Sequence, residues 1–286
     1  INSMSDMGFG FVEVGTVLKN PNAGNKLPRI FKDGDNQNIF NNMGLNSKGI
    51  EYVSNNLEKK VKNNIIGVNI GQNYNSLDSI KDYSEVLEKI DKHADYIVLN
   101  ISCTNNTTFD NYKNIDYLSK IIKNAKENST KPVLIKIPPD INYYLLCNLI
   151  NLSILYNING LIVSNTLKTD KGGLSGKSIE SVTSELIKTV YKLSGGQIPI
   201  IGCGGVFSGE DAYRKIKNGA SLIQIYTSFI YNGPKVIYDI NKELDELLIN
   251  DGYSNISQCV GTNIDLKYTY NELFDSYYKY LISYWN

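Results

Sequence analysis

The sequence is poor in the residues on which several common chemistries depend. Its 286 residues include a single histidine, His93, and four cysteines without any CxxC spacing. One histidine cannot supply a histidine-based metal site, and a Ser-His-Asp triad is equally unexpected. We interpret the four cysteines as reduced thiols, neither disulfide partners nor zinc ligands, and expect no metal site. They are Cys103, Cys147, Cys203 and Cys259.

Net charge and long hydrophobic runs are also absent. Twenty-nine Lys and Arg balance 29 Asp and Glu, so the chain has no charge excess to attract nucleic acid. The apolar runs fall well short of the roughly 20 residues that a membrane span needs. Arginine is scarce, whereas Asn, Lys and Tyr are abundant throughout. Because this bias is typical of genomic base composition, no single Asn or Lys is taken as functional on its own.

Short apolar and β-branched runs alternate with longer segments of helical periodicity. The predicted strands are Phe11–Thr16, Ile65–Ile70, Tyr96–Ile101, Val133–Ile137, Gly160–Ser164, Ile198–Gly202 and Leu222–Tyr226. The predicted helices are Ser76–Lys92, Ile115–Glu127, Tyr143–Tyr156, Ile179–Leu193, Gly209–Asn218 and Lys235–Asn250. Apolar strands between helices predict an α/β fold with a covered parallel sheet. Seven such units favour a (β/α)8 TIM barrel over an open doubly wound sheet.

Seven strands are one fewer than a closed barrel requires. Residues Ile1–Met7 are typical of a helix end that leads into the first strand, so we expect the first βα unit to precede this sequence. Residues 17–48 form a long connection, which is often a cap over a functional site. We assign the barrel to residues 1–262 and interpret the aromatic-rich residues 263–286 as a C-terminal helical extension.

Polar residues follow the carboxyl ends of the predicted strands, where barrel enzymes place their sites. They comprise amides, one lysine and one thiol, but no carboxylate pair of the kind that sugar hydrolysis needs. This set suits a polar heterocycle. Gly204 and Gly205 lie beside the last two strand ends, where barrels commonly bind phosphate. The glycines of residues 171–178 lack the spacing of a nucleoside triphosphate loop.

Two side chains at these strand ends could take part in chemistry. Lys136 ends a buried strand, where a bound anion or an electron-poor ring would stabilise its charge. The alternative is a lysine that reaches solvent or pairs with a carboxylate. Cys103 follows another strand and could be an inert, small apolar residue. If it is reactive, its ordinary pKa of about 8.5 makes it a better proton acceptor than a serine hydroxyl.

From about Met7 to Gly261 the chain resembles the dihydroorotate dehydrogenase family, nearest to its membrane-associated, quinone-reducing class. The resemblance runs through GFGFVEVGTV, GNKLPRIF, NNMGLNSKG, GVNIGQN, ADYIVLNISCTN, VLIKIPPD, GLIVSNT, GGLSGKS, IPIIGCGGVFSG and GASLIQIYTS, in this order. It implies an FMN-containing (β/α)8 barrel that oxidises dihydroorotate to orotate in pyrimidine biosynthesis.

The resemblance also implies roles for individual residues. Cys103 falls at the position of the catalytic base, and Lys136 at that of a cation that stabilises the reduced flavin. The implied substrate-binding residues are Asn41, Asn100, Asn105, Asn165 and Thr166. The implied FMN-binding residues are Gly15, Thr16, Asn69, Asn100, Lys136, Ser164, Ser175, Gly176, Gly204, Gly205, Tyr226 and Thr227.

The sequence departs from the family at the catalytic loop. The quinone class has serine as its base where this chain has Cys103, and residues 104–110 lack the prolines, the glycine and the arginine of the family's loop. The departures leave two alternatives to a dihydroorotate dehydrogenase that reduces a quinone. One is a catalytically impaired homologue that serves as a binding scaffold, and the other is an FMN oxidoreductase for another pyrimidine-like ring.

The same resemblance implies a location. It indicates the mitochondrial inner membrane, with peripheral association through N-terminal helices that the given sequence does not contain; a cytoplasmic location is the alternative. Dihydroorotate and a quinone are the expected small-molecule partners, and no nucleic-acid partner is expected.

Overall fold

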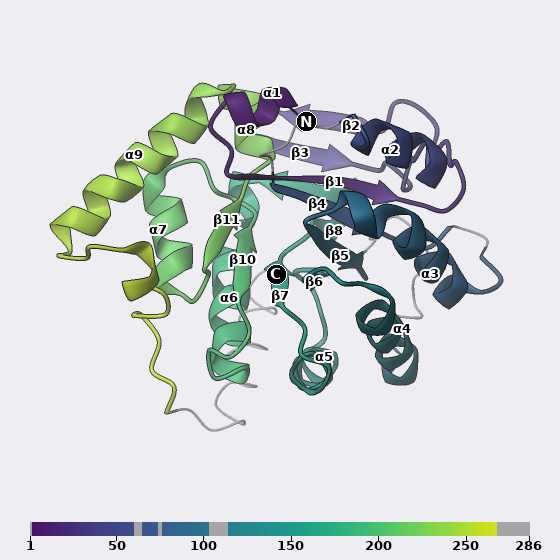
Figure 1. Cartoon of the computed structure of the whole chain (residues 1–286). Coiled ribbons are helices and arrows are strands. Elements are labelled where there is room, and N and C mark those ends of the chain that lie inside the picture. The colour runs from purple at the N-terminus through teal and green to yellow at the C-terminus, as the bar shows by residue number, and fades with distance from the viewer. Residues whose placement is uncertain (1, 60–64, 74–75, 103–113, 268–286) are drawn as a thin grey trace.

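The computed structural model describes residues 2–59, 65–73, 76–102 and 114–267. Seven parallel strands form its main sheet, in the order β1-β4-β5-β6-β7-β10-β11. Their bounds are β1 Phe11–Val17, β4 Ile65–Ile70, β5 Tyr96–Asn100, β6 Val133–Ile137, β7 Gly160–Val163, β10 Ile200–Cys203 and β11 Leu222–Gln224. These are the seven strands that the sequence predicts. Figure 1 shows the sheet curling into a partial barrel, the architecture of a TIM-barrel fold.

Helices cover the outer side of this curved sheet (Figure 1). They are α2 Gly49–Leu57, α3 Ser79–Ile90, α4 Ile115–Asn128, α5 Tyr143–Leu155, α6 Glu180–Leu193, α7 Gly209–Lys217 and α9 Lys235–Asn250. Several begin at a side-chain cap: Asn114 accepts hydrogen bonds from two backbone N–H groups of α4, and Asn142 does the same for α5. The predicted helices are confirmed to within a few residues, whereas α2 was not predicted.

The main hydrophobic core lies between the sheet and these helices. Strands β4 to β7 are buried along almost their entire length, as expected for parallel strands that are covered on both faces. Their outward side chains, such as Val68, Leu99 and Ile135, pack against helical residues such as Val86 and Leu118. Burial of this apolar surface holds each helix against the sheet.

A second, antiparallel sheet lies at one end of the barrel. Its order is β2-β3-β9-β8, formed by β2 Ile30–Asp33, β3 Asn38–Asn41, β8 Leu167–Thr169 and β9 Gly172–Gly176. The sequence predicts only a long connection over residues 17–48, but residues 30–41 are a hairpin. The hairpin was missed because its strands are short and because β9, its other partner, lies some 130 residues further along the chain.

Three segments complete the described chain. Helix α1, Asn2–Asp6, agrees with the helix predicted over the first residues, and α8, Thr227–Asn232, follows the last strand. The predicted extension over residues 263–286 falls mostly outside the described residues, which end at 267. Within the described ranges, no helix combines the length and the apolar character that a membrane span requires.

Candidate active site

The interior of the barrel changes from apolar to polar along its strands. On β5, Tyr96 and Val98 belong to a buried interior cluster, and Asn100 follows on the same face. On β6, Leu134 belongs to that cluster and Lys136 follows it. Because alternate strand residues share a face, the apolar plug fills the amino-terminal end and polar groups gather at the carboxyl-terminal end. This is the end at which the sequence predicts the site.

Amide and hydroxyl side chains from neighbouring strands form one hydrogen-bonded chain there. Thr16 Oγ1 donates to Asn69 Oδ1 at 2.9 Å and accepts from Asn100 Nδ2 at 3.0 Å. Asn100 Oδ1 in turn accepts from the Ser102 hydroxyl at 2.8 Å. Asn165 Nδ2 donates to the same Ser102 Oγ at 2.8 Å. The predicted hydroxyl of β1 and the predicted amides of β4, β5 and the residues after β7 therefore lie together and fix one another's orientation.

A buried charged centre lies beside this chain. Lys136 Nζ is 3.5 Å from Glu13 Oε1 and donates to Gln224 Oε1 at 3.0 Å. Glu13 also accepts from Asn69 Nδ2 at 2.9 Å and from Gln224 Nε2 at 3.0 Å. The side chains of Lys136 and Glu13 are only 15% and 9% exposed, so both charges are largely removed from water. A carboxylate partner, the alternative considered for Lys136, is thus present.

The Glu13 carboxylate keeps Lys136 charged. Burial by itself would lower the pKa of Lys136, but the charge of Glu13, a smaller contribution from Cys203 and the hydrogen bond to Glu13 together raise that pKa above its ordinary value. Burial also raises the pKa of the nearby Cys203 thiol. The centre therefore presents one cation to any ligand at the barrel mouth, and its counter-charge is held beneath it.

Sequence reasoning missed Glu13, Gln224 and Ser102. Glu13 carried a readable signal, because a carboxylate in the middle of an apolar strand needs a buried partner. That partner, Lys136, is on β6, and two strands separate it from β1 in the sheet, so the pair forms across the barrel interior only when the sheet curls. Gln224 and Ser102 carried no comparable signal, since neutral polar residues are common at strand ends.

Glycines surround the carboxyl ends of β10 and β9. Gly204, Gly205 and Gly176 have φ values of +105°, +73° and +117°, which other residues rarely adopt. A Cβ on Gly205 would lie 2.4 Å from the Glu180 Cα, because this loop packs directly on the start of α6. At its other side Thr227 Oγ1 donates to Ser175 Oγ at 2.9 Å, which joins α8 to β9. These predicted FMN-binding residues, Gly176, Gly204, Gly205, Ser175 and Thr227, therefore come together from separate elements and are called the glycine cradle below.

The antiparallel sheet brings two predicted substrate residues together. Asn41 Nδ2 donates to the Gly173 carbonyl oxygen at 3.1 Å. A Cβ on Gly173 would lie 2.4 Å from Thr166 Oγ1 and 3.2 Å from Asn41 Nδ2. Gly173 thus allows β3 and the β7–β8 connection to approach each other closely. Asn41 and Thr166 consequently meet at one point, although 125 positions separate them in the sequence.

Other predicted residues are placed less directly. Cys103 and Asn105 lie outside the described residues. Ser164 is buried and its hydroxyl donates to the Asn165 carbonyl at 3.1 Å, next to the amide chain. Gly15 is pressed against β4, where a Cβ would meet the Asn69 carbonyl oxygen at 2.5 Å. Tyr226 is 71% exposed and leads into α8.

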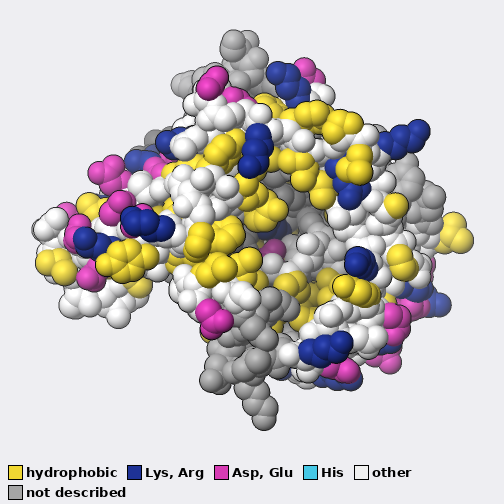
Figure 2. All heavy atoms as spheres, turned by 90° about the horizontal axis from the view of Figure 1, so that it is seen from above, with side chains coloured by type: hydrophobic (Ala, Val, Ile, Leu, Met, Phe, Trp, Pro, Cys, Tyr) yellow, Lys and Arg dark blue, Asp and Glu magenta, His cyan; other side chains and the backbone are white. Residues whose placement is uncertain are grey.

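The face that carries α8 and the β2–β3 hairpin is hollowed near its centre, and hydrophobic side chains surround the hollow (Figure 2). In the part of the chain that the structure describes, no group of three or more His, Cys, Asp or Glu side chains could hold a metal ion. The arrangement is an enclosed polar floor with one cation, suited to a planar ring with alternating hydrogen-bond donors and acceptors.

Comparison with known proteins gives one consistent family. The family model of dihydroorotate dehydrogenase matches residues 1–248. Dihydroorotate dehydrogenase (quinone) of Sulfurimonas denitrificans is 37% identical over 274 residues, covering 92% of this chain and 78% of the relative. The mitochondrial enzyme of Oryza sativa is 34% identical over 309 residues, covering 92% of this chain and 66% of the relative.

A solved structure agrees with these sequence relatives. The ligand-free dihydroorotate dehydrogenase of Eimeria tenella superimposes with a TM-score of 0.87 at 30% identity, covering 92% of this chain and 84% of that one. Because the superposition covers 92% of this chain, it includes both the barrel and the antiparallel sheet.

Proposed function

The chain belongs to the dihydroorotate dehydrogenase family, and from this premise we propose that it oxidises dihydroorotate to orotate with FMN as its redox cofactor and a quinone as the final electron acceptor. Its relatives are oxidoreductases named dihydroorotate dehydrogenase (quinone), an activity of pyrimidine biosynthesis. The observation that carries the proposal is the buried Lys136 ammonium, held among neutral amides at the carboxyl-terminal end of the barrel.

The residues present fit FMN. A flavin ring carries alternating carbonyl oxygens and nitrogens, to which amide and hydroxyl groups can both donate and accept. Asn69, Asn100 and Thr16 supply such groups, and Lys136 supplies a cation for a ring that becomes electron-rich on reduction. The glycine loop after β10 offers backbone N–H groups for a phosphate, without side chains that would obstruct it.

We place the substrate beside the same floor. Asn165, Asn100, Asn41 and Thr166 are proposed to hydrogen-bond the dihydroorotate ring, because they converge from β7, β5 and the antiparallel sheet. Cys103, which lies outside the described residues, directly follows Ser102 in the sequence. Ser102 itself is buried and held by Asn100 and Asn165, so the catalytic loop begins from a fixed point.

The chemistry then divides between the cofactor and the chain. When bound, FMN would supply the acceptor for the hydride that leaves carbon 6 of dihydroorotate. The Cys103 thiolate takes the proton from carbon 5. Lys136 would provide positive charge to the bound ring, and Glu13 keeps that lysine protonated and in place. The amides orient the substrate ring so that both bonds break in one geometry.

The test is dihydroorotate-dependent reduction of a soluble quinone by the purified protein and by Cys103→Ala. We expect turnover to fall about 100-fold or more in the variant, because a positioned general base contributes roughly 100- to 10,000-fold. In Cys103→Ser, the rise of the rate with pH should move to higher pH, because a hydroxyl gives up its proton less readily than a thiol. Full activity in Cys103→Ala would refute the base assignment.

Quinone reduction and location rest on the relatives. Relatives from Oryza sativa and Mus musculus are named mitochondrial, and that of Sulfurimonas denitrificans is bacterial. We propose peripheral association with the mitochondrial inner membrane. Fractionation of source cells, with the protein followed by antibody, tests this location; recovery in the cytosol alone would contradict it.

A further inference from the structure

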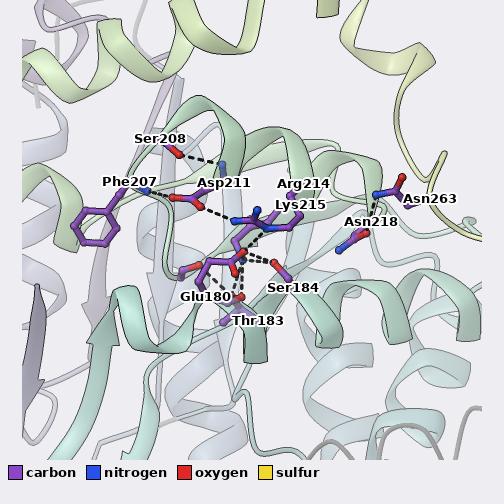
Figure 3. A network of polar contacts seen from close by, with 11 residues as sticks. Glu180, Thr183, Ser184, Phe207, Ser208, Asp211, Arg214, Lys215, Asn218 and Asn263 are labelled. Carbon is purple, nitrogen blue, oxygen red and sulfur yellow. Dashed lines mark hydrogen bonds and ion pairs between the residues drawn. The ribbon is translucent and has the colours of Figure 1, made fainter. Parts of the chain in front are cut away.

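A fully buried lysine lies behind the glycine cradle, outside the site described above. Lys215 is on α7, and its side chain is 0% exposed between α7 and the start of α6. Figure 3 shows it pointing toward Glu180, Thr183 and Ser184 of α6. Burial of an ammonium group is unfavourable unless the group is hydrogen-bonded, so the partners of Lys215 indicate what this lysine does.

Each proton of the Lys215 ammonium has an acceptor on α6. Nζ is 2.6 Å from Thr183 Oγ1, 3.0 Å from Ser184 Oγ and 3.3 Å from the Glu180 carbonyl oxygen. The nearest carboxylate contact is longer, at 3.8 Å to Glu180 Oε1. An ammonium only donates, so Thr183 Oγ1 must accept from Lys215 and turn its own proton elsewhere.

The Thr183 proton is directed to the cradle. Thr183 Oγ1 lies 3.0 Å from the Gly204 carbonyl oxygen and 3.0 Å from that of Glu180. Of these two acceptors, Gly204 belongs to the loop after β10, so the Thr183 hydroxyl links Lys215 to that loop. In a planar trans peptide the C=O and the next N–H point in opposite directions. With the Gly204 carbonyl held toward α6, the Gly205 N–H is turned away from α6.

The far end of the same loop is also fixed by this network (Figure 3). Phe207 N–H donates to Asp211 Oδ2 at 2.9 Å. Arg214 joins the two ends, because it donates to Asp211 at 2.6 Å and to Glu180 at 3.0 Å. Two cations and two carboxylates thus enclose the loop that runs from Gly204 to Phe207, and their charges balance.

We propose that Lys215 is a positioning residue for the FMN phosphate, acting through Thr183 to aim the backbone N–H of Gly205 at the phosphate. This inference rests on the proposed function, because it needs FMN as the ligand. It concerns only the phosphate end of the cofactor. Loss of Lys215 should therefore weaken binding of FMN but spare riboflavin, which has the same ring without the phosphate.

The experiment measures affinity, independent of turnover. The full chain, freed of bound flavin, is titrated with FMN and with riboflavin, and quenching of flavin fluorescence reports binding. In Lys215→Met we expect the dissociation constant for FMN to rise about tenfold or more and that for riboflavin to change by less than about twofold. Lys217→Met is the matched control, because Lys217 is on the same helix but pairs with Asp251 at 3.1 Å.

A gentler pair of variants tests the relay if Lys215→Met fails to fold. Thr183→Val removes the hydroxyl at nearly constant volume and should weaken FMN binding selectively, whereas Thr183→Ser keeps the hydroxyl and should bind FMN as the unaltered protein does. Equal losses for FMN and riboflavin, or no loss for FMN, would overturn the inference. An unaltered protein that binds neither flavin would instead refute the proposed function, and the inference with it.

Discussion

Among the described residues, Lys136 and Lys215 are both largely removed from water and both lie near a glutamate, but their pKa values are shifted in opposite directions. At the barrel mouth, Glu13 raises the pKa of Lys136 despite its burial. Behind the cradle, burial lowers the pKa of Lys215 to about 8, although Glu180 opposes that shift. The carboxylate oxygen is 3.5 Å from Nζ in the first pair and 3.8 Å in the second.

The difference lies in what else contacts each ammonium. Lys136 has a carboxylate that is itself held by Asn69 and Gln224, and so its positive charge is secured for a ligand. Lys215 donates its hydrogen bonds to neutral hydroxyl and carbonyl oxygens, while Arg214 donates to the Glu180 carboxylate in its place. The first lysine thus serves as a charge, and the second as a hydrogen-bond donor that fixes a loop.

The largest expected effect on stability comes from breaking the pair of Lys136 and Glu13. Lys136→Met leaves the Glu13 carboxylate buried without its cation, which should lower the free energy of unfolding by about 3–5 kcal/mol. Urea denaturation measures it. The double variant Lys136→Met with Glu13→Gln should recover much of the loss, because no lone charge remains. A loss below about 1 kcal/mol in the single variant would show that the pair is not buried in solution.

A backbone change in the glycine loop after β10 should have the next largest effect on stability. Gly205→Ala combines a φ of +73° with a Cβ only 2.4 Å from the Glu180 Cα, so we expect a loss of about 2–3 kcal/mol. Gly233→Ala is the matched control: its φ is +67°, but a Cβ there meets nothing within 4 Å. It should cost about 1 kcal/mol. Equal losses at the two sites would contradict the close packing on α6.

The lowered pKa of Lys215 predicts a pH effect. Between about pH 8 and its ordinary value of 10.5, the unfolded chain holds a proton that the folded chain has released, so raising the pH favours folding. Relative to Lys215→Met, the unaltered protein should gain stability by at most about 1.4 kcal/mol per pH unit above pH 8. Urea denaturation at pH 7.5 and pH 9.5 measures this gain; parallel changes in both proteins would contradict it.

A surface pair should show the smallest effect. Lys235 and Asp239 lie one turn apart on α9 at 2.6 Å, and the lysine is 78% exposed. Lys235→Met should therefore change the free energy of unfolding by less than about 0.5 kcal/mol, with still less effect at high salt. A loss comparable to that of Lys136→Met would mean that burial does not distinguish these pairs.

Sequence patterns predicted the elements that depend on neighbouring residues in the chain, and missed the contacts between distant ones. All seven barrel strands are rich in apolar and β-branched residues, and their predicted positions agree with the structure. The β2–β3 hairpin was missed because its pairing with β9 is long-range. Lys215 was missed because α7 reads as a helix with an ordinary charged face, and only packing against α6 shows that this lysine is buried. Polar residues at strand ends were predicted as a group, but the Glu13 pair needed the curled sheet.

The central claim is that the polar floor around Lys136 holds FMN and presents it to dihydroorotate. The most direct test is the visible spectrum of the purified protein under anaerobic conditions, before and after addition of dihydroorotate. The account predicts a flavin absorption band that bleaches when dihydroorotate is added. A folded protein with no flavin band would contradict the account, and a band that stays oxidised would contradict the substrate assignment.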